Sequence, residues 1–330
     1  MNPFLQERIQ RKLHALKACD WPNPYLDDAL GKIRPTELCI VGARTGAGKT
    51  EFATNVAIHN ARKGKKVFFF ALEAEKYEID RRIKYQLLSD KFFENRSKYP
   101  PGMKLSFLTW LNDMHPELES LENEVDEIAQ VATGNLEIYA PGTAFFSKKD
   151  FGVVYEEVAQ EANLIILDHI HYISPELREA EYDHLKQTMW RLRDLINKYE
   201  VPVVAVSHLR KESRQNFSLV PTLDEIHGSS EITKQANHVV GIAPCYEFPR
   251  KSKPEETCSA PMGTTFFKVL KTRTGHASGR YLAALSFDLD KKQYSERYVP
   301  FFTDQFSTEI KTMEYKDFEY WMKSAKEQAV

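Results

Sequence analysis

The sequence is short of several features that would assign it quickly. Its 330 residues contain few cysteines, with no CxxC pair and no matching histidine spacing: Cys19, Cys39, Cys245 and Cys258. This scarcity argues against a structural zinc site and against a disulfide framework, and it favours a reducing cytoplasmic compartment. The formal net charge is −2, so a basic nucleic-acid-binding surface would have to be local.

Long apolar runs are also missing. No stretch approaches the roughly eighteen apolar residues of a membrane span, and the N-terminal MNPFLQERIQRKLHALKACD carries charges every few positions. We therefore expect neither secretion nor a membrane span. The hydrophobic share of 42% is enough for a full core, and we expect one large α/β domain with appendages.

Apolar strands alternate with helical patterns over most of the chain. The runs ELCIVGA, KKVFFFAL, NLEIYA, ANLIILDHI and VPVVAVSHL are typical of strands buried on both faces of a parallel sheet. Helical patterns separate several of them, and repeated βα alternation predicts a mainly parallel central sheet flanked by helices. Near the C-terminus, the run TTFFKVLKTRTGHASGRYLAALSFDLDKKQYSE predicts antiparallel hairpins that extend the sheet.

The chain divides into a core and two terminal segments. Residues 1–22 contain a short amphipathic helix whose apolar stripe is Leu5, Ile9, Leu13 and Leu16. We expect the core at 23–298, with a less predictable helical insertion at 91–133, and a Phe/Tyr-rich helical tail at 299–330.

A glycine-rich turn, ARTGAGKT, lies between an apolar strand and a helical pattern. This context predicts a P-loop, in which Lys49 reaches the β- and γ-phosphates of ATP and Thr50 ligates Mg²⁺. The strict motif has glycine at position 43, whereas here the glycine stands one place earlier, so the match is to the relaxed form. The predicted nucleotide-binding residues are Gly42, Ala43, Arg44, Thr45, Gly46, Ala47, Gly48, Lys49, Thr50 and Glu51.

A carboxylate ends a second apolar strand, LIILDHIHY. Asp168 is placed to hold Mg²⁺ through water. His169 and His171 follow it, and alternation puts them on one side of the strand end. Two histidines without a third ligand favour polar packing over a metal site, although both interpretations stay open.

Two further polar residues end apolar strands. Glu73 follows VFFFAL, a strand that we expect directly beside the P-loop strand, and it is a candidate for polarising the attacking water. The alternative is an acidic residue at a helix N-terminus, since EAEKYE also suits a helix start. His208 ends VPVVAVSHL, where it would contact the γ-phosphate.

Basic residues gather at two places. The loop after His208 carries Arg210, Lys211 and Arg214, and the small-residue turn Gly228, Ser229 and Ser230 follows it. Together they would grip a nucleic-acid backbone, or else form an ordinary solvated loop.

The segment KTRTG forms the second basic group. Lys271 and Arg273 face the same way at a predicted strand end, where they would complete a phosphate site in a neighbouring subunit or simply form a basic sheet edge.

These motifs, in this order, resemble the RecA-type ATPase core of DnaB-like replicative helicases. The resemblance runs from about Pro24 to Glu296 and is interrupted at 91–133. It implies a RecA-like fold and a homo-oligomer, a hexameric ring, with ATP and Mg²⁺ between subunits and single-stranded DNA in the central channel. The position of Ala43 after a glycine agrees with the family pattern.

The resemblance also implies roles for the motif residues. Lys49 and Thr50 would bind phosphate and Mg²⁺, and Glu73 would be the catalytic glutamate. Asp168 would be the Walker B acid, and His208 would stand where the family usually has a sensor glutamine. Arg273 and Lys271 would match the family's basic pair, the arginine finger and its partner, which acts on the ATP of a neighbouring subunit.

Three segments would form the contacts of the ring. Loops that begin near Ser174 and that lie between Arg210 and Glu231 would line the channel. The helix at 3–18 resembles the linker helix that packs on an adjacent subunit.

Departures from the family pattern keep a second function open. The family's N-terminal domain is not expected here, and HGSSEI is closer to plasmid RepA-type and RadA-type members. The leading hypothesis is a DNA-stimulated ATPase that moves along single-stranded DNA. The alternative is a regulatory or scaffold ATPase, KaiC-like, in a defence or mobile-element assembly, with a protein partner at 91–133 or the tail. A small-molecule kinase is a third, weaker interpretation.

Overall fold

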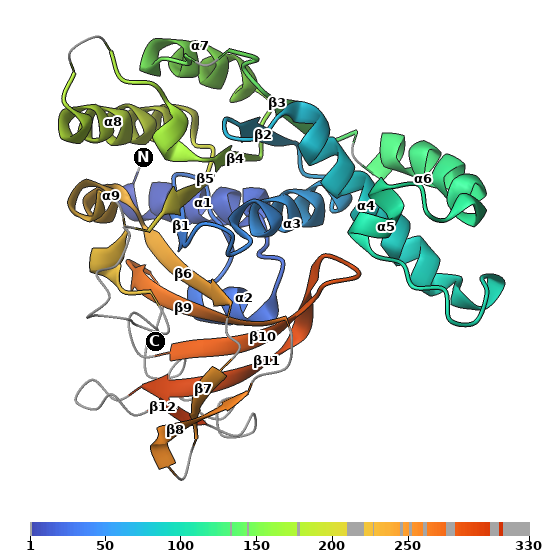
Figure 1. Ribbon diagram of the computed structural model, residues 1–330. Helices are drawn as coiled ribbons and strands as arrows, with labels where there is room; N and C mark the ends of the chain where they lie inside the picture. Colours follow the sequence, from blue (N-terminus) through green and yellow to red (C-terminus); the bar gives the residue numbers. More distant parts are fainter. Residues whose placement is uncertain are drawn as a thin grey trace.

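The computed structural model places most of the chain (Figure 1). The described residues are 2–132, 134–143, 145–176, 179–209, 221–226, 228–244, 247–250, 253–259, 263–274, 281–303 and 310–312.

A ten-stranded sheet organises the described chain, in the order β12-β11-β10-β9-β6-β1-β5-β4-β2-β3. The strands from β6 to β3 pair in parallel, whereas β9 to β12 pair antiparallel. The predicted fold class, a RecA-like parallel sheet with C-terminal antiparallel hairpins, is therefore confirmed. The strands are β1 (Leu38–Ala43), β2 (Val67–Ala71), β3 (Leu136–Tyr139), β4 (Leu164–Asp168), β5 (Val203–His208), β6 (His238–Pro244), β9 (Thr264–Thr272), β10 (Tyr281–Asp288), β11 (Gln293–Thr303) and β12 (Ile310–Thr312), with β7 (Glu247–Arg250) and β8 (Lys253–Ser259) as a separate pair.

Helices cover both faces of the parallel region. Alternate residues of β1 enter two different cores: Cys39 and Val41 pack with α3 and α4, and Leu38 and Ile40 pack with α7 and α8. This double burial explains why the strands are continuously apolar. The helices are α1 (Pro3–Lys17), α2 (Pro24–Leu30), α3 (Lys49–Arg62), α4 (Lys76–Glu94), α5 (Phe107–Leu111), α6 (Glu119–Ala132), α7 (Lys148–Val158), α8 (Glu181–Tyr199) and α9 (Ser229–Gln235).

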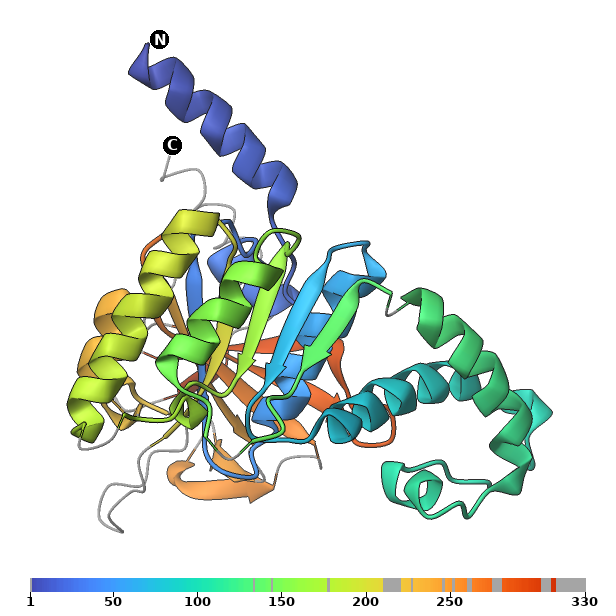
Figure 2. The ribbon, with the colours of Figure 1, turned by 90° about the horizontal axis from the view of Figure 1, so that it is seen from above.

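Two helical segments project from this body. Figure 2 shows α1 extending away from the sheet on one side, and α5 and α6 extending away on another, beyond the end of α4. The expected insertion at 91–133 is thus helical over most of its length, and α4 and α6 contact each other. Among the described residues no helix is both long and apolar enough to cross a membrane.

The structure corrects two details of the sequence interpretation. Strand β2 does not lie beside the P-loop strand β1, because β5 and β4 stand between them. The expected boundary after residue 298 falls inside β11, which continues to Thr303 and pairs with β12. The predicted helical tail lies largely outside the described residues.

Candidate nucleotide-binding site

The P-loop turn opens into a cavity of ≈ 630 Å³, lined from Thr45 to Glu51 and by residues from α4 and the C-terminal strands. Gly46 and Gly48 have φ values of 76° and 82°, a left-handed conformation in which a side chain would be strained. Gly48 is also the N-cap of α3, so its neighbours present main-chain N–H groups at a helix N-terminus. The turn therefore has the backbone form of a phosphate-binding loop.

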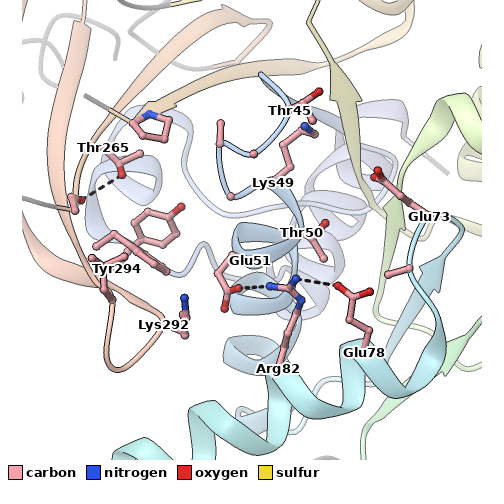
Figure 3. A pocket seen from close by; sticks show the side chains of 18 of the residues that line it. Thr45, Lys49, Thr50, Glu51, Glu73, Glu78, Arg82, Thr265, Lys292 and Tyr294 are labelled. Atoms are coloured by element: carbon pink, nitrogen blue, oxygen red, sulfur yellow. Dashed lines mark hydrogen bonds and ion pairs between the residues drawn. The ribbon is translucent and has the colours of Figure 1, made fainter. Parts of the chain in front are cut away.

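Lys49 points into this cavity (Figure 3). Its Nζ atom donates a hydrogen bond to the main-chain carbonyl of Arg44 at 3.0 Å. Burial lowers the pKa of Lys49, while the carboxylates of Glu73 and Asp168 oppose that change. An anion in the cavity would meet a partly desolvated ammonium group, which strengthens their attraction.

Asp168 lies at the end of β4, level with Ala71 of β2. Its side chain is fully buried, and neither carboxylate oxygen has a hydrogen-bond partner among the residues described. Burial raises the pKa of Asp168 to about 6, and the neighbouring Thr50 hydroxyl partly opposes this rise. A buried carboxylate whose only nearby donor among these residues is a threonine hydroxyl, at a distance or angle too poor for a hydrogen bond, fits a hydrated divalent cation such as Mg²⁺.

Glu73 reaches the same edge from the end of β2. Its main-chain N–H donates to the carbonyl of Asp168 at 3.3 Å, which ties the two strand ends together. Helix α4 begins at Lys76 and has Glu75 as its N-cap, so Glu73 precedes the helix and does not cap it. Its side chain lines the cavity, which is the position that a water-polarising carboxylate requires.

His208 also lines the cavity, from the end of β5. Its ring centroid is 4.0 Å from that of His169, which is buried behind it. Beside them, Nε2 of His171 lies 3.1 Å from the Ser207 hydroxyl. The strand ends thus bring together three histidines that the sequence places in two separate motifs.

Several lining residues were not predicted from sequence. Arg82 of α4 forms ion pairs with Glu51, at 2.6 Å, and with Glu78, at 2.9 Å. The Glu78–Arg82 spacing of one helical turn is a signal that the sequence carried. Thr265 and Tyr294 enter from strands β9 and β11, and Lys292 enters from the turn between β10 and β11; no local pattern indicates this.

The first three predicted nucleotide-binding residues, Gly42, Ala43 and Arg44, are not among the residues that line the cavity. Gly42 and Ala43 end β1, and the cavity lining begins at Thr45. A Cβ atom at Gly42 would come within 3.2 Å of Leu209 and 3.3 Å of Ile226, so this glycine makes room for packing under the loop.

Lys271 and Arg273 lie elsewhere. Lys271 donates to the carbonyls of Thr233 and Ala236, and Arg273 donates to the carbonyl of Lys234 at 2.5 Å. Both cations therefore contact the C-terminal end of α9 within the same chain.

The predicted nucleic-acid residues are only partly described. Arg210, Lys211 and Arg214 fall outside the described residues. Gly228 precedes α9, and Ser229 and Ser230 begin it. Their contact with nucleic acid stays a prediction.

Comparisons with known proteins agree on one family. The model described as DnaB-like helicase C terminal domain matches residues 23–296. A probable replicative DNA helicase from Trieres chinensis is 26% identical over 221 residues, covering 65% of this chain and 45% of the relative. The replicative DNA helicase DnaB of Mycoplasma genitalium is 22% identical over 298 residues, covering 86% and 57%. The chain thus spans about half the length of these curated relatives.

Solved structures share the fold. One reported as a DnaB-like replicative helicase and its interactions with primase superposes with a TM-score of 0.65 at 14% identity, covering 89% of this chain and 66% of that one.

Proposed function

The chain belongs to the DnaB-like helicase C-terminal domain family, and we propose that it is an ATP-hydrolysing, ring-forming helicase or translocase that acts on single-stranded DNA. The ring is a hexamer in this proposal, and the activity serves DNA replication in the cytoplasm. The observation that carries the proposal is the meeting of Lys49, Asp168 and Glu73 at one edge of the sheet.

Each of these residues has a distinct task. The P-loop amides and Lys49 hold the phosphates of ATP, while Thr50 and Asp168 hold Mg²⁺. The chemistry that a bound Mg²⁺ would supply here is electrostatic, since it would stabilise the negative charge that develops during phosphoryl transfer. Glu73 orients the attacking water and accepts its proton, and His208 contacts the γ-phosphate.

Assembly into a ring is supported by the position of the basic pair. The cavity uses Thr264 and Thr265 from one end of β9, and Lys271 and Arg273 stand at the other end. Because the pair cannot reach its own cavity, a catalytic role requires a neighbouring copy. Such a head-to-tail contact repeats around a closed ring.

A second candidate is a regulatory or scaffold ATPase that binds a protein partner. The projecting segment at 91–133 exposes apolar side chains, with Leu108 67% and Met114 62% accessible. Exposed apolar groups on a protruding element favour a protein contact.

ATP hydrolysis with and without single-stranded DNA separates the two candidates. We expect stimulation by an oligonucleotide at low salt, and no activity in a Lys49→Ala variant. A rate unchanged by DNA, together with no retention of the protein on oligonucleotides, would exclude the helicase and leave the scaffold ATPase. A mass measurement with a non-hydrolysable ATP analogue tests the hexamer.

A further inference from the structure

A second cluster of metal-ligand side chains adjoins the phosphate site. One ligand atom from each of Glu73, His169 and His208 lies within 4.8 Å of the other two. These residues come from the ends of β2, β4 and β5, so the cluster exists only because the sheet brings three strand ends together. We propose that these three side chains bind a transition-metal ion of the Zn²⁺ type, and that the bound ion inhibits ATP hydrolysis by engaging Glu73.

The spacing already suits such an ion. Nε2 of His169 lies 3.2 Å from Oε2 of Glu73. Two donors that are each about 2.0–2.1 Å from a tetrahedral Zn²⁺ lie about 3.3 Å apart. These two ligands therefore need almost no rearrangement, and His208 needs a small movement of its side chain at the cavity wall.

His169 is an unusual buried histidine. It is 1% exposed, and apart from the approach of Nε2 to Glu73, neither ring nitrogen has a hydrogen-bond partner among the described residues. Its Nε2 atom faces the Glu73 carboxylate, and both ring nitrogens lie out of contact with solvent, so the ring is already held where a metal ion between these side chains would need it.

The donor set separates this site from the Mg²⁺ position. Mg²⁺ takes oxygen ligands in octahedral geometry, whereas imidazole nitrogens with a carboxylate suit Zn²⁺ and its neighbours in the first transition series. Two imidazoles and one carboxylate, with a fourth position open to solvent, is a donor set that zinc enzymes use. The positive charge of Lys49 lies near this site and would repel a metal cation. The negative charge of Glu73 partly cancels that repulsion.

Another group of potential ligands, Glu37, Cys39 and His238, is buried in the core. Both ring nitrogens of His238 have partners there, Thr272 Oγ1 at 2.9 Å and Glu37 Oε1 at 3.4 Å. This second group is consequently a satisfied polar cluster, and it serves as an internal control.

The inhibitory effect rests on the proposed function, since it assumes that Glu73 polarises the attacking water. A carboxylate that ligates a metal ion cannot accept a proton from that water at the same time. Metal binding itself does not depend on ATP, so the two inferences are testable separately.

The binding test uses the full chain without nucleotide, in excess Mg²⁺, with Zn²⁺ titrated against a chromogenic chelator. His208→Gln and Glu73→Gln are expected to weaken Zn²⁺ binding more than about tenfold, because each removes a direct ligand. His171→Gln is the matched control, since it alters a neighbouring ring outside the ligand set, and Cys39→Ala tests the buried group. Circular dichroism checks that each variant is folded.

Several outcomes would overturn the site. These are a wild-type chain that does not compete for Zn²⁺, a loss in His171→Gln as large as that in His208→Gln, or a loss in Cys39→Ala instead. Equal affinity for Zn²⁺ in all variants would do the same.

The inhibition test measures the ATPase rate with and without Zn²⁺ in wild type and in His169→Gln, which removes a proposed metal ligand that has no role in the proposed hydrolysis. We expect the ratio of the rate with Zn²⁺ to the rate without it to fall well below one in wild type and to stay near one in the variant. Zn²⁺ binding without a change in rate would overturn the inhibitory role. A chain that binds Zn²⁺ through these residues but hydrolyses no ATP would refute the proposed function and leave the metal site standing.

Discussion

Thr265 and Arg273 lie at opposite ends of one strand, β9, with Thr265 in the cavity wall and Arg273 just beyond the strand's last residue. Eight residues at about 3.4 Å each separate them by about 27 Å. Arg273 therefore stands too far from the phosphates of its own chain to act on them.

Mixing two inactive variants tests this arrangement. Arg273→Ala lacks the finger, and Lys49→Ala lacks the phosphate contact, so each alone should be inactive. In mixed rings, some interfaces pair an intact P-loop with an intact finger, and activity should return to a fraction of the wild-type rate. ATPase assays over a range of mixing ratios measure this. If mixtures stay as inactive as the separate variants, Arg273 does not act in trans.

Helix α1 offers an unpaired apolar stripe. None of its residues is buried in the described chain, and Phe4 and Leu16 are 83% and 77% accessible. We expect the double variant Ile9→Glu, Leu13→Glu to lower the oligomeric mass, because a neighbouring subunit would have to bury the two charges. Lys12→Glu, which changes charge outside the stripe, is the control. An unchanged mass for the double variant in analytical ultracentrifugation would refute this role of α1.

The Glu51–Arg82 pair should contribute to stability. Arg82→Ala leaves the buried Glu51 carboxylate with Gln86 Nε2, at 3.3 Å, as its remaining side-chain donor among the residues that the structure describes. Because Arg82 is partly exposed, we expect a loss of about 2 kcal/mol in the free energy of unfolding. Urea denaturation measures it. Arg81→Ala, one position away on the exposed face, should change stability by less than about 0.5 kcal/mol, and an equal effect of both variants would contradict the assignment.

Asp168→Asn should stabilise the chain in the absence of Mg²⁺ and nucleotide. The folded-state pKa of Asp168, about 6, lies above the ordinary value of 3.8, so the folded chain resists losing this proton. In wild type, the protonated Asp168 side chain therefore contributes stability that is fully present below about pH 4 and is lost as the pH rises through 6. The difference between a pKa of 3.8 and one of about 6 corresponds to about 3 kcal/mol, which is the upper limit of the stability that Asp168→Asn would gain at pH 7.5.

Urea denaturation at pH 7.5 and at acidic pH checks this for both forms. The difference between Asp168→Asn and wild type should shrink as the pH falls below 6. A gain that does not vary with pH would show that the ionised carboxylate is not its cause.

Gly228 and Gly31 form a matched pair. Both have positive φ, 71° and 74°, but a Cβ at Gly228 would lie 1.9 Å from Cδ2 of buried Leu185, whereas one at Gly31 meets no atom within 4 Å. We expect Gly31→Ala to cost about 1 kcal/mol from backbone strain alone, and Gly228→Ala at least about 2 kcal/mol. Thermal unfolding compares them. In a double-mutant cycle, the cost of Gly228→Ala should be smaller in a Leu185→Ala background than in wild type, because the clashing side chain is gone. Equal costs would rule out the steric contact.

Local patterns were enough to identify the strands and the phosphate loop. Strand β1 is apolar at every position because helices cover both of its faces, and the P-loop needs Gly46 and Gly48 for its backbone angles. The order of the strands was less accessible. We expected Glu73 on a neighbour of β1, but β2 lies beyond β5 and β4. The sequence of a crossover connection does not show how many strand positions it passes over, so this order was not predictable from local patterns.

The sequence by itself determined the family, the fold class and the residues of the phosphate loop, because these depend on short-range spacing. Only the tertiary structure decided what surrounds them. It brought Arg82 and Tyr294 to the cavity, and it joined His169 to Glu73 and His208, two residues that precede and follow it by dozens of positions. Contacts of this kind depend on which strand ends share an edge of the sheet, and the packing of the whole domain sets that edge.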